Sequence, residues 1–205
     1  NTIFNVAHEA GLVTAWSDKH AVYESFNGPS GNGISDMFAP EIDSYALHPN
    51  GTRYPGDTIW TGDNAATMQY DSYKVQAVLN WIDGYDHSRE HKTGTPAIFG
   101  MNFQTVSTAE KLPMSDGLLG GYLPGTTTPG PLLARALQYI NDQLLKLDNA
   151  IKARGLTDST AIILSAKHGQ SPQNPNQLVR IDDGPIIQGV NEAWTKAHPG
   201  AGPLV

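Results

Sequence analysis

Three short apolar segments alternate with helical repeats along the chain, and this alternation is the feature that most restricts the fold. The segments are Leu12–Trp16, Pro96–Phe103 and Thr160–Ser165, and each is short enough to be a strand. Alternating strands and helices are typical of α/β proteins with a mainly parallel sheet, because each helix returns the chain to the start of the next strand. We therefore predict an α/β fold in which helices flank a mainly parallel sheet.

Four stretches carry apolar residues at the spacing of a helix. Their expected bounds are 3–10, 71–83, 131–154 and 185–197. Thr2 is placed to cap the first helix, and Gly11 is placed to end it. Pro131 suits the first position of the longest helix, and Gly155 ends that helix. Its stripe of leucine and isoleucine must pack on an apolar surface, and we expect that surface to be the sheet.

The chain of 205 residues is long enough for one α/β domain, and we predict a single, partial domain over 1–205. From about 23 to 70 no periodicity holds and turn residues are frequent, which predicts a long loop-rich insertion. Both ends suggest a piece of a longer protein. A helical pattern begins at once after Thr2, and Leu204 and Val205 resemble the first residues of a strand.

Composition excludes several classes of protein. The formal net charge is −7 and no basic cluster occurs, which disfavours binding to a nucleic-acid duplex. No apolar run approaches the roughly 20 residues of a membrane-spanning helix. The absence of cysteine excludes disulfides, thiol catalysis and cysteine-bound zinc. The sequence lacks the glycine-rich motifs that are usual in acyl-transfer enzymes, nucleotide-dependent switches and NAD-dependent enzymes.

Polar residues follow each of the three apolar segments directly. These groups are Ser17–His20, Gln104–Thr108 and Lys167–Gln170. Ligands of open α/β sheets bind at the carboxyl ends of the strands, so we expect the groups to share one edge. Asp18, His20 and His168 would supply one carboxylate and two imidazoles, which suits a divalent metal such as zinc. Alternatively, each polar residue only ends a strand and faces water.

Three further motifs are weaker candidates. His87 and His91 have the spacing of one helix face, but Gly84 favours a solvated loop there. Asp182–Gly184 lacks the other ligands of a calcium loop and fits the start of a helix equally well. Asn50–Thr52 is a formal glycosylation acceptor in a turn, which matters only for a secreted eukaryotic protein.

Three stretches in order resemble a known family. They are Gly11–His20, Pro96–Gln104 and Ile162–Pro172. The chain resembles, over nearly its whole length, the type I phosphodiesterase/nucleotide pyrophosphatase branch of the alkaline-phosphatase superfamily, and most closely a bacterial-type subgroup. This resemblance implies an alkaline-phosphatase-like fold and phosphoester hydrolysis at two metal ions, usually zinc, with a Ser or Thr nucleophile. A secreted or periplasmic location is expected for such a protein.

The family's metal ligands are only partly matched. They come from an early aspartate, an Asp-x-x-x-His segment, an adjacent Asp-His pair and a late histidine. The nucleophile and the early aspartate would precede Asn1, and the late histidine would follow Val205. His168 matches the histidine of the pair, but Lys167 replaces its aspartate. The Asp-x-x-x-His segment falls on Ser107–Lys111, where Ser and Lys stand at the ligand positions.

The first functional hypothesis is a phosphoester hydrolase that carries part of its site in this chain. Its expected metal ligands are Asp18, His20 and His168. Lys19 or Lys167 would hold the anionic substrate, which is expected to be a phosphorylated small molecule or inorganic phosphate.

The second hypothesis is a metal-free relative that binds phosphate or another anion. Lys111, Lys167 and His168 would form its pocket, because an ammonium group repels a cation and can replace the charge of a metal ion as a point charge. A third hypothesis is that this piece is catalytically inert.

Overall fold

The computed structural model describes residues 1–166, 179 and 181–205. The chain divides into two compact units, Asn1–Gln170 and Ser171–Val205, and each is described by itself. The polar group predicted after the third apolar segment, Lys167–Gln170, lies outside the described residues. The roles predicted for Lys167 and His168 therefore stay predictions.

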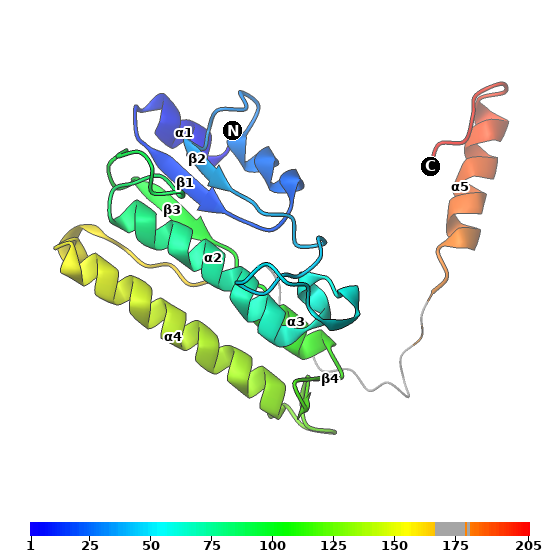
Figure 1. Ribbon diagram of the computed structural model, residues 1–205. Helices are drawn as coiled ribbons and strands as arrows, with labels where there is room; N and C mark the ends of the chain where they lie inside the picture. Colours follow the sequence, from blue (N-terminus) through cyan, green and yellow to red (C-terminus); the bar gives the residue numbers. More distant parts are fainter. Residues whose placement is uncertain (167–178, 180) are drawn as a thin grey trace. The chain divides into compact units, whose positions relative to one another are not determined.

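The first unit contains helices and strands in alternation (Figure 1). Its α-helices are α1 (Ile3–Glu9), α2 (Asn64–Ile82), α3 (Thr105–Lys111) and α4 (Pro131–Ala153). Its strands are β1 (Thr14–Ser17), β2 (Asp36–Phe38), β3 (Ile98–Met101), β4 (Met114–Ser115) and β5 (Leu118–Leu119). Short 3₁₀ helices are η1 (Ala21–Asn27), η2 (Pro55–Asp57), η3 (Trp60–Gly62) and η4 (Thr157–Ser159).

The main sheet of the described residues has three parallel strands in the order β2-β1-β3. Ala15 of β1 pairs with Asp36 of β2 on one side and with Phe99 of β3 on the other. The predicted α/β class with a parallel sheet is therefore confirmed. Strand β2 lies within the stretch 23–70, whose turn-rich sequence gave no sign of a strand. The two-stranded β4-β5 hairpin is antiparallel.

Helices cover both faces of the sheet. Successive side chains of a strand point to opposite faces, so neighbouring apolar residues of β1 contact different helices. Ala15 is fully buried and belongs to a core cluster with Trp81 of α2. Trp16, the next residue, instead meets Phe4 of α1 edge to face, with ring centroids 5.7 Å apart. Strand β1 is the most buried strand of the sheet, whereas β3, which we predicted to be covered on both faces, is half-buried along its length.

Helix α2 begins seven residues earlier than its predicted start at Asp71. The Asp63 carboxylate caps it by accepting a hydrogen bond of 2.8 Å from the backbone N–H of Ala66. Its first turns bury Ala66 and Tyr70 against Trp60, so tertiary packing extends the helix through a stretch with weak periodicity.

Helix α4 begins at Pro131 and is followed by Gly155 with φ of 68°, as its sequence predicts. Figure 1 shows it beside α2, and its first turns pack Leu132 and Leu133 in a cluster with Ala109 of α3. Near its end, Ile151 joins the core cluster of the sheet. The prediction that this helix packs mainly on the sheet is therefore wrong, because α2 and α3 accept most of its apolar stripe.

The third predicted strand, Thr160–Ser165, is not formed in the structure. The segment makes no backbone ladder with any described residue, and a strand needs such a partner. Ile163 and Leu164 are 88% and 70% exposed. An apolar strand-like sequence therefore lies on the surface of this unit.

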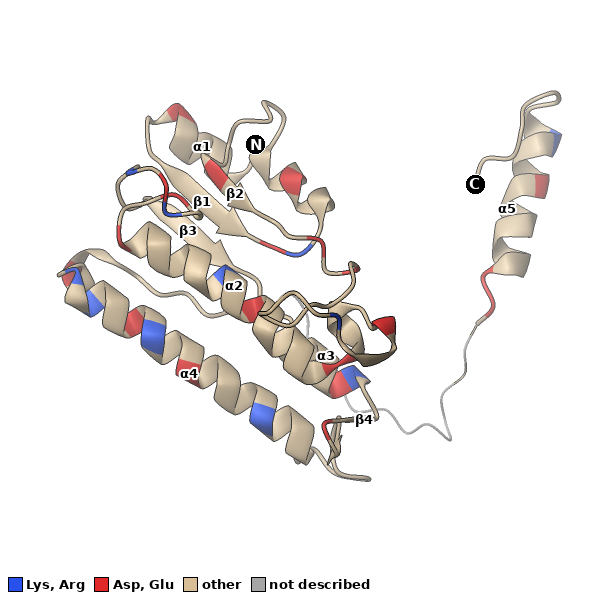
Figure 2. Cartoon of the chain, in the orientation of Figure 1, with Lys and Arg blue, Asp and Glu red and all other residues tan. Residues whose placement is uncertain are grey.

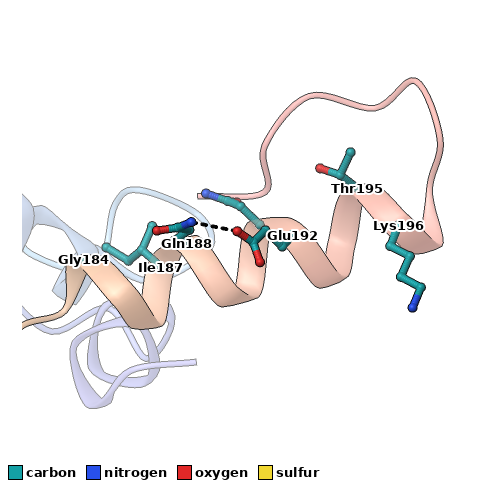
Figure 3. A pocket seen from close by; sticks show the side chains of 7 residues that line it. Gly184, Ile187, Gln188, Glu192, Thr195 and Lys196 are labelled. Atoms are coloured by element: carbon teal, nitrogen blue, oxygen red, sulfur yellow. Dashed lines mark hydrogen bonds between the residues drawn. The ribbon is translucent and has the colours of Figure 1, made fainter.

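The second unit consists of α5 (Gly184–Ala197) and the segment after it. The helix matches the predicted one within a residue. Asn191 holds the chain end, because its Oδ1 accepts hydrogen bonds from the backbone N–H groups of Leu204 and Val205 at 2.8 and 3.0 Å. A shallow hollow lies along this helix (Figure 3). Among the described helices, none is both long and apolar enough for a membrane span.

Candidate functional site at the carboxyl ends of the strands

The three parallel strands of the sheet end at the same edge, here called the rim. Asp18, Lys19 and His20 follow β1 directly. The loop after β2 supplies Glu41 and Asp43, and the loop after β3 supplies Asn102 and Gln104. Figure 2 shows acidic segments on the loops that follow β1 and β2.

Two hydrogen bonds join the end of β1 to the end of β3. The Lys19 Nζ donates to Gln104 Oε1 at 3.0 Å. Asn102 Nδ2 donates to Asp18 Oδ1 at 3.2 Å. The polar groups after the first and second apolar segments, which are far apart in the sequence, therefore lie side by side.

Asp18 is buried, with 1% of its surface exposed. Its Oδ2 accepts a hydrogen bond of 3.0 Å from Trp16 Nε1, and its Oδ1 accepts from the backbone N–H of Lys19 at 3.0 Å as well as from Asn102. A carboxylate has about four acceptor positions, so most of those of Asp18 are already used within the protein.

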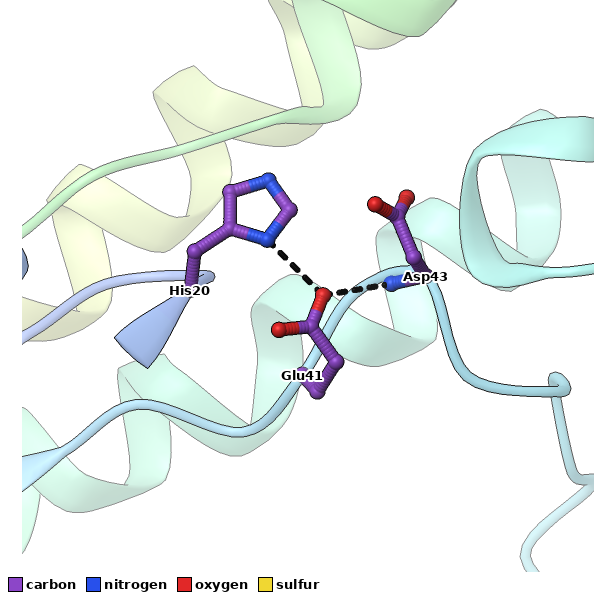
Figure 4. Close-up of side chains that lie close together, drawn as sticks. All are labelled: His20, Glu41 and Asp43. Carbon is purple, nitrogen blue, oxygen red and sulfur yellow. Dashed lines mark hydrogen bonds and ion pairs between the residues drawn. The ribbon is translucent and has the colours of Figure 1, made fainter. Parts of the chain in front are cut away.

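His20 faces two carboxylates of the loop after β2 (Figure 4). Its Nδ1 lies 2.8 Å from Glu41 Oε1. The backbone N–H of Asp43 donates to the same oxygen at 3.0 Å and lowers the pKa of the Glu41 carboxyl; slight desolvation opposes this, and the His20 hydrogen bond adds to the lowering. One ligand atom from each of His20, Glu41 and Asp43 can be chosen so that all three lie within 4.8 Å of one another. Asp18 is not part of this group.

A buried ion pair of α2 holds one loop of the rim in place. Asp71 and Lys74 of α2 lie 3.0 Å apart with fully buried side chains. Asp71 accepts hydrogen bonds from the backbone N–H groups of Gln104 and Thr105, and Lys74 Nζ donates to the carbonyl oxygen of Asn102. The turn after β3 is therefore fixed by charged groups of α2.

The electrostatic character of the rim is shown by Tyr70, whose hydroxyl donates to the carbonyl oxygen of Pro40 at 2.5 Å. Burial raises the pKa of this phenol, and the negative charges of Asp71, Asp18, Glu41 and Asp43 raise it further. Burial disfavours a charge of either sign, so only the contribution of these carboxylates reflects the negative charge of the rim.

The remaining predicted residues lie elsewhere or outside the described part. Lys111 is the last residue of α3 and is exposed. It is separated from Thr105, the first residue of that helix, by about 9 Å along the helix axis. His87 and His91 lie in a loop, as predicted, and His87 Nδ1 is 2.6 Å from Asp36 Oδ1. Asp183 precedes α5 and makes no side-chain capping bond.

Sequence reasoning missed Glu41, Asp43, Asp71 and Lys74. Glu41 and Asp43 follow a three-residue strand that has no periodic pattern, so their place at the rim had no signal. Asp71 and Lys74 are three residues apart on a helix. From the sequence alone, this spacing indicates an ion pair on the exposed surface of the helix.

Comparison of the chain with family models, with curated proteins and with solved structures finds no match.

Proposed function

We propose that the chain carries part of a phosphoester hydrolase of the alkaline-phosphatase type, related to the type I phosphodiesterases, and that the rim is its site. The proposal rests on the resemblance of the three sequence stretches and on the arrangement of the rim. Parallel α/β sheets bind ligands at this edge, and here the edge gathers an imidazole, carboxylates and an ammonium group.

The observation that carries the proposal is the pair of hydrogen bonds that joins the ends of β1 and β3. Through them, Lys19 lies beside Gln104 while His20, one residue later, faces Glu41. A cation ligand and a phosphate-binding ammonium group are thus neighbours on one short segment.

His20 would hold a divalent metal ion, for which its imidazole is a suitable donor. Asp18 and His168 stay the other ligands of the sequence-based hypothesis, and of these only His168 matches a ligand position of the family. A bound metal ion would neutralise negative charge on the phosphoryl oxygens. Lys19 would attract and orient the anionic substrate as a point charge, and the buried Asp71–Lys74 pair would keep the turn at Gln104 in place.

The test is hydrolysis of bis(p-nitrophenyl) phosphate by the full-length protein that contains this chain, because the proposal assigns only part of the site to these 205 residues. We expect activity that disappears with a chelator, returns with Zn²⁺ and falls in His20→Ala and Lys19→Ala. His91→Ala is the matched control, because His91 is exposed and lies in the loop at 84–94. Hydrolysis that is undetectable with Zn²⁺, Mn²⁺ and Mg²⁺ alike, or that is equal in the His20→Ala variant, would reject the proposal.

The acidic rim favours metal-dependent hydrolysis over metal-free anion binding. The loops after β1 and β2 carry the three carboxylates of Asp18, Glu41 and Asp43 beside the ammonium-bearing residue Lys19. Phosphate binding that survives a chelator and falls in Lys19→Ala would instead support the metal-free alternative.

A further inference from the structure

The cluster of His20, Glu41 and Asp43 combines donors of two chemical kinds from two separate loops. His20 follows β1, and the two carboxylates follow β2, 21 and 23 residues after His20 in the chain. For three atoms that all lie within 4.8 Å of one another, there is a point no more than about 2.8 Å from each of them, so small side-chain rotations bring all three to the 2.0–2.2 Å of a zinc ligand.

The backbone that carries these donors is held in place independently of them. The backbone N–H of Ile42, between the two carboxylates, donates to the carbonyl oxygen of Lys19 at 3.0 Å. The Ile42 side chain is 2% exposed, and the Tyr70 hydroxyl donates to the carbonyl oxygen of Pro40. The loop after β2 is therefore anchored on both sides of Glu41, to Tyr70 of α2 at Pro40 and to the loop after β1 at Ile42, which keeps the donors together without an ion.

The site is also accessible and electrostatically suited to a cation. The Glu41 and Asp43 residues are exposed and His20 is half-exposed, so an ion can enter without local unfolding. Asp18, by contrast, is buried, and its carboxylate oxygens already accept hydrogen bonds from Trp16, Lys19 and Asn102.

We propose that His20, Glu41 and Asp43 bind one divalent cation of borderline hardness, with Zn²⁺ preferred over Mg²⁺. The imidazole nitrogen favours zinc, because magnesium prefers an all-oxygen, octahedral shell. Three protein donors leave a position for water or a phosphoryl oxygen, as in catalytic zinc sites. Any role of this ion in hydrolysis rests on the proposed function, whereas binding of the ion is measured without substrate.

The test is calorimetric titration of the chelator-treated 205-residue chain with Zn²⁺ and, separately, with Mg²⁺. We expect the affinity of one Zn²⁺ site to fall by more than about tenfold in each of His20→Ala, Glu41→Gln and Asp43→Asn. The controls His91→Ala and Asp57→Asn remove an exposed imidazole and an exposed carboxylate from other loops, and they should retain the affinity of the wild type.

A spectroscopic measurement separates ligation from a structural effect. Co²⁺ bound in place of zinc should give visible absorption bands that the three cluster variants lose and the two controls keep. Far-ultraviolet circular dichroism of each variant without metal checks that it is folded. Unchanged Zn²⁺ affinity in folded Glu41→Gln and Asp43→Asn would overturn the proposal, as would equal affinity for Mg²⁺.

The outcome also distinguishes this site from the proposed function. Zinc binding that depends on Glu41 and Asp43, with no phosphodiesterase activity in the full-length protein, would support the site and reject the hydrolase. Zinc-dependent hydrolysis that is unaffected by the same two substitutions would support the hydrolase and reject this site.

Discussion

The Asp71 carboxylate and the Lys74 ammonium group lie 3.0 Å apart, and neither side chain has any exposed surface. Each charge also serves the turn after β3. Asp71 accepts from the backbone N–H groups of Gln104 and Thr105, and Lys74 donates to the carbonyl oxygen of Asn102. An ion pair of one helix therefore determines the position of a loop that begins 28 residues further along the chain.

Replacement of Asp71 with Asn should destabilise the protein strongly. The substitution keeps the size of the side chain but leaves the Lys74 charge buried without an opposite charge, which costs about 3–5 kcal/mol. Urea unfolding measures the change. The exposed pair of Arg53 and Asp57 offers the control, because Asp57→Asn breaks an ion pair in water and should leave the unfolding midpoint unchanged. A loss of less than about 1 kcal/mol in Asp71→Asn would contradict the importance of the pair.

Addition of a methyl group at Gly100 should disturb the rim from within the sheet. A Cβ at this position would lie 2.8 Å from Trp16 Cζ3, so Trp16 must move, and with it the hydrogen bond from its ring to Asp18. We expect Gly100→Ala to cost about 1–3 kcal/mol in thermal or urea unfolding. Gly189→Ala in α5 is the control, because a Cβ there meets nothing within 4 Å and alanine favours a helix. Equal stability of the two variants would show that Trp16 is not tightly packed.

Two phenols, the buried Tyr70 and the half-buried Tyr139, make the folded state sensitive to alkaline pH. Burial, and then nearby carboxylates, raise the pKa of Tyr70 above its ordinary value of 10.0, and burial followed by Asp71 raises that of Tyr139. The folded protein therefore keeps these protons where the unfolded chain loses them. This contribution to stability is complete below pH 10 and is lost as pH rises further.

A spectrophotometric titration of tyrosinate checks this expectation. Tyr70 and Tyr139 should ionise only as the protein unfolds, so that Tyr70→Phe removes amplitude from the last phase of the titration. Tyr45→Phe, which removes an exposed phenol, should leave that phase intact. Loss of amplitude from the early phase in Tyr70→Phe would show that the hydroxyl is not buried.

The loop at 84–94 is held against β2 by one carboxylate. Asp36 accepts hydrogen bonds of 2.6 Å from Trp81 Nε1 and from the backbone N–H of His87, and the His87 ring stacks on Phe38. In His87→Ala the loop loses the ring contacts, at a cost of about 1 kcal/mol. Limited proteolysis by trypsin at Arg89 should then be about fivefold faster. His91→Ala, which removes an exposed ring from the same loop, should be cleaved at the rate of the wild type.

The parts of the fold that the sequence predicts are those with strong local signals. Pro131 and Gly155 bound the longest helix because their backbone preferences act within one turn. Strand β3 lies within a predicted apolar segment, and β1 overlaps another and ends one residue beyond it. Strand β2 and the first turns of α2 depend on contacts distant in the sequence, such as the pairing of Ala15 with Asp36 and the packing of Tyr70 on Trp60, so no local pattern marks them.

The same distinction applies to the candidate site. Asp18 and His20 are predictable because they end an apolar segment, and the general rule for α/β sheets places them at the ligand-binding edge. The partners of these two residues cannot be predicted from the sequence. Whether His20 faces Glu41 depends on the strand order β2-β1-β3, which is a property of the folded sheet rather than of any one segment.

The exposed apolar segment Ile162–Leu164 has a consequence for how this protein behaves among other molecules. Extended, uncharged sequence rich in branched side chains tends to pair with strands of neighbouring chains and so to aggregate. From Thr160 to Ser165 no charge interrupts it, and the nearest charged residues are Asp158 before it and Lys167 after it. These two flanking charged residues therefore oppose such pairing, and their replacement with uncharged residues should favour precipitation at high concentration.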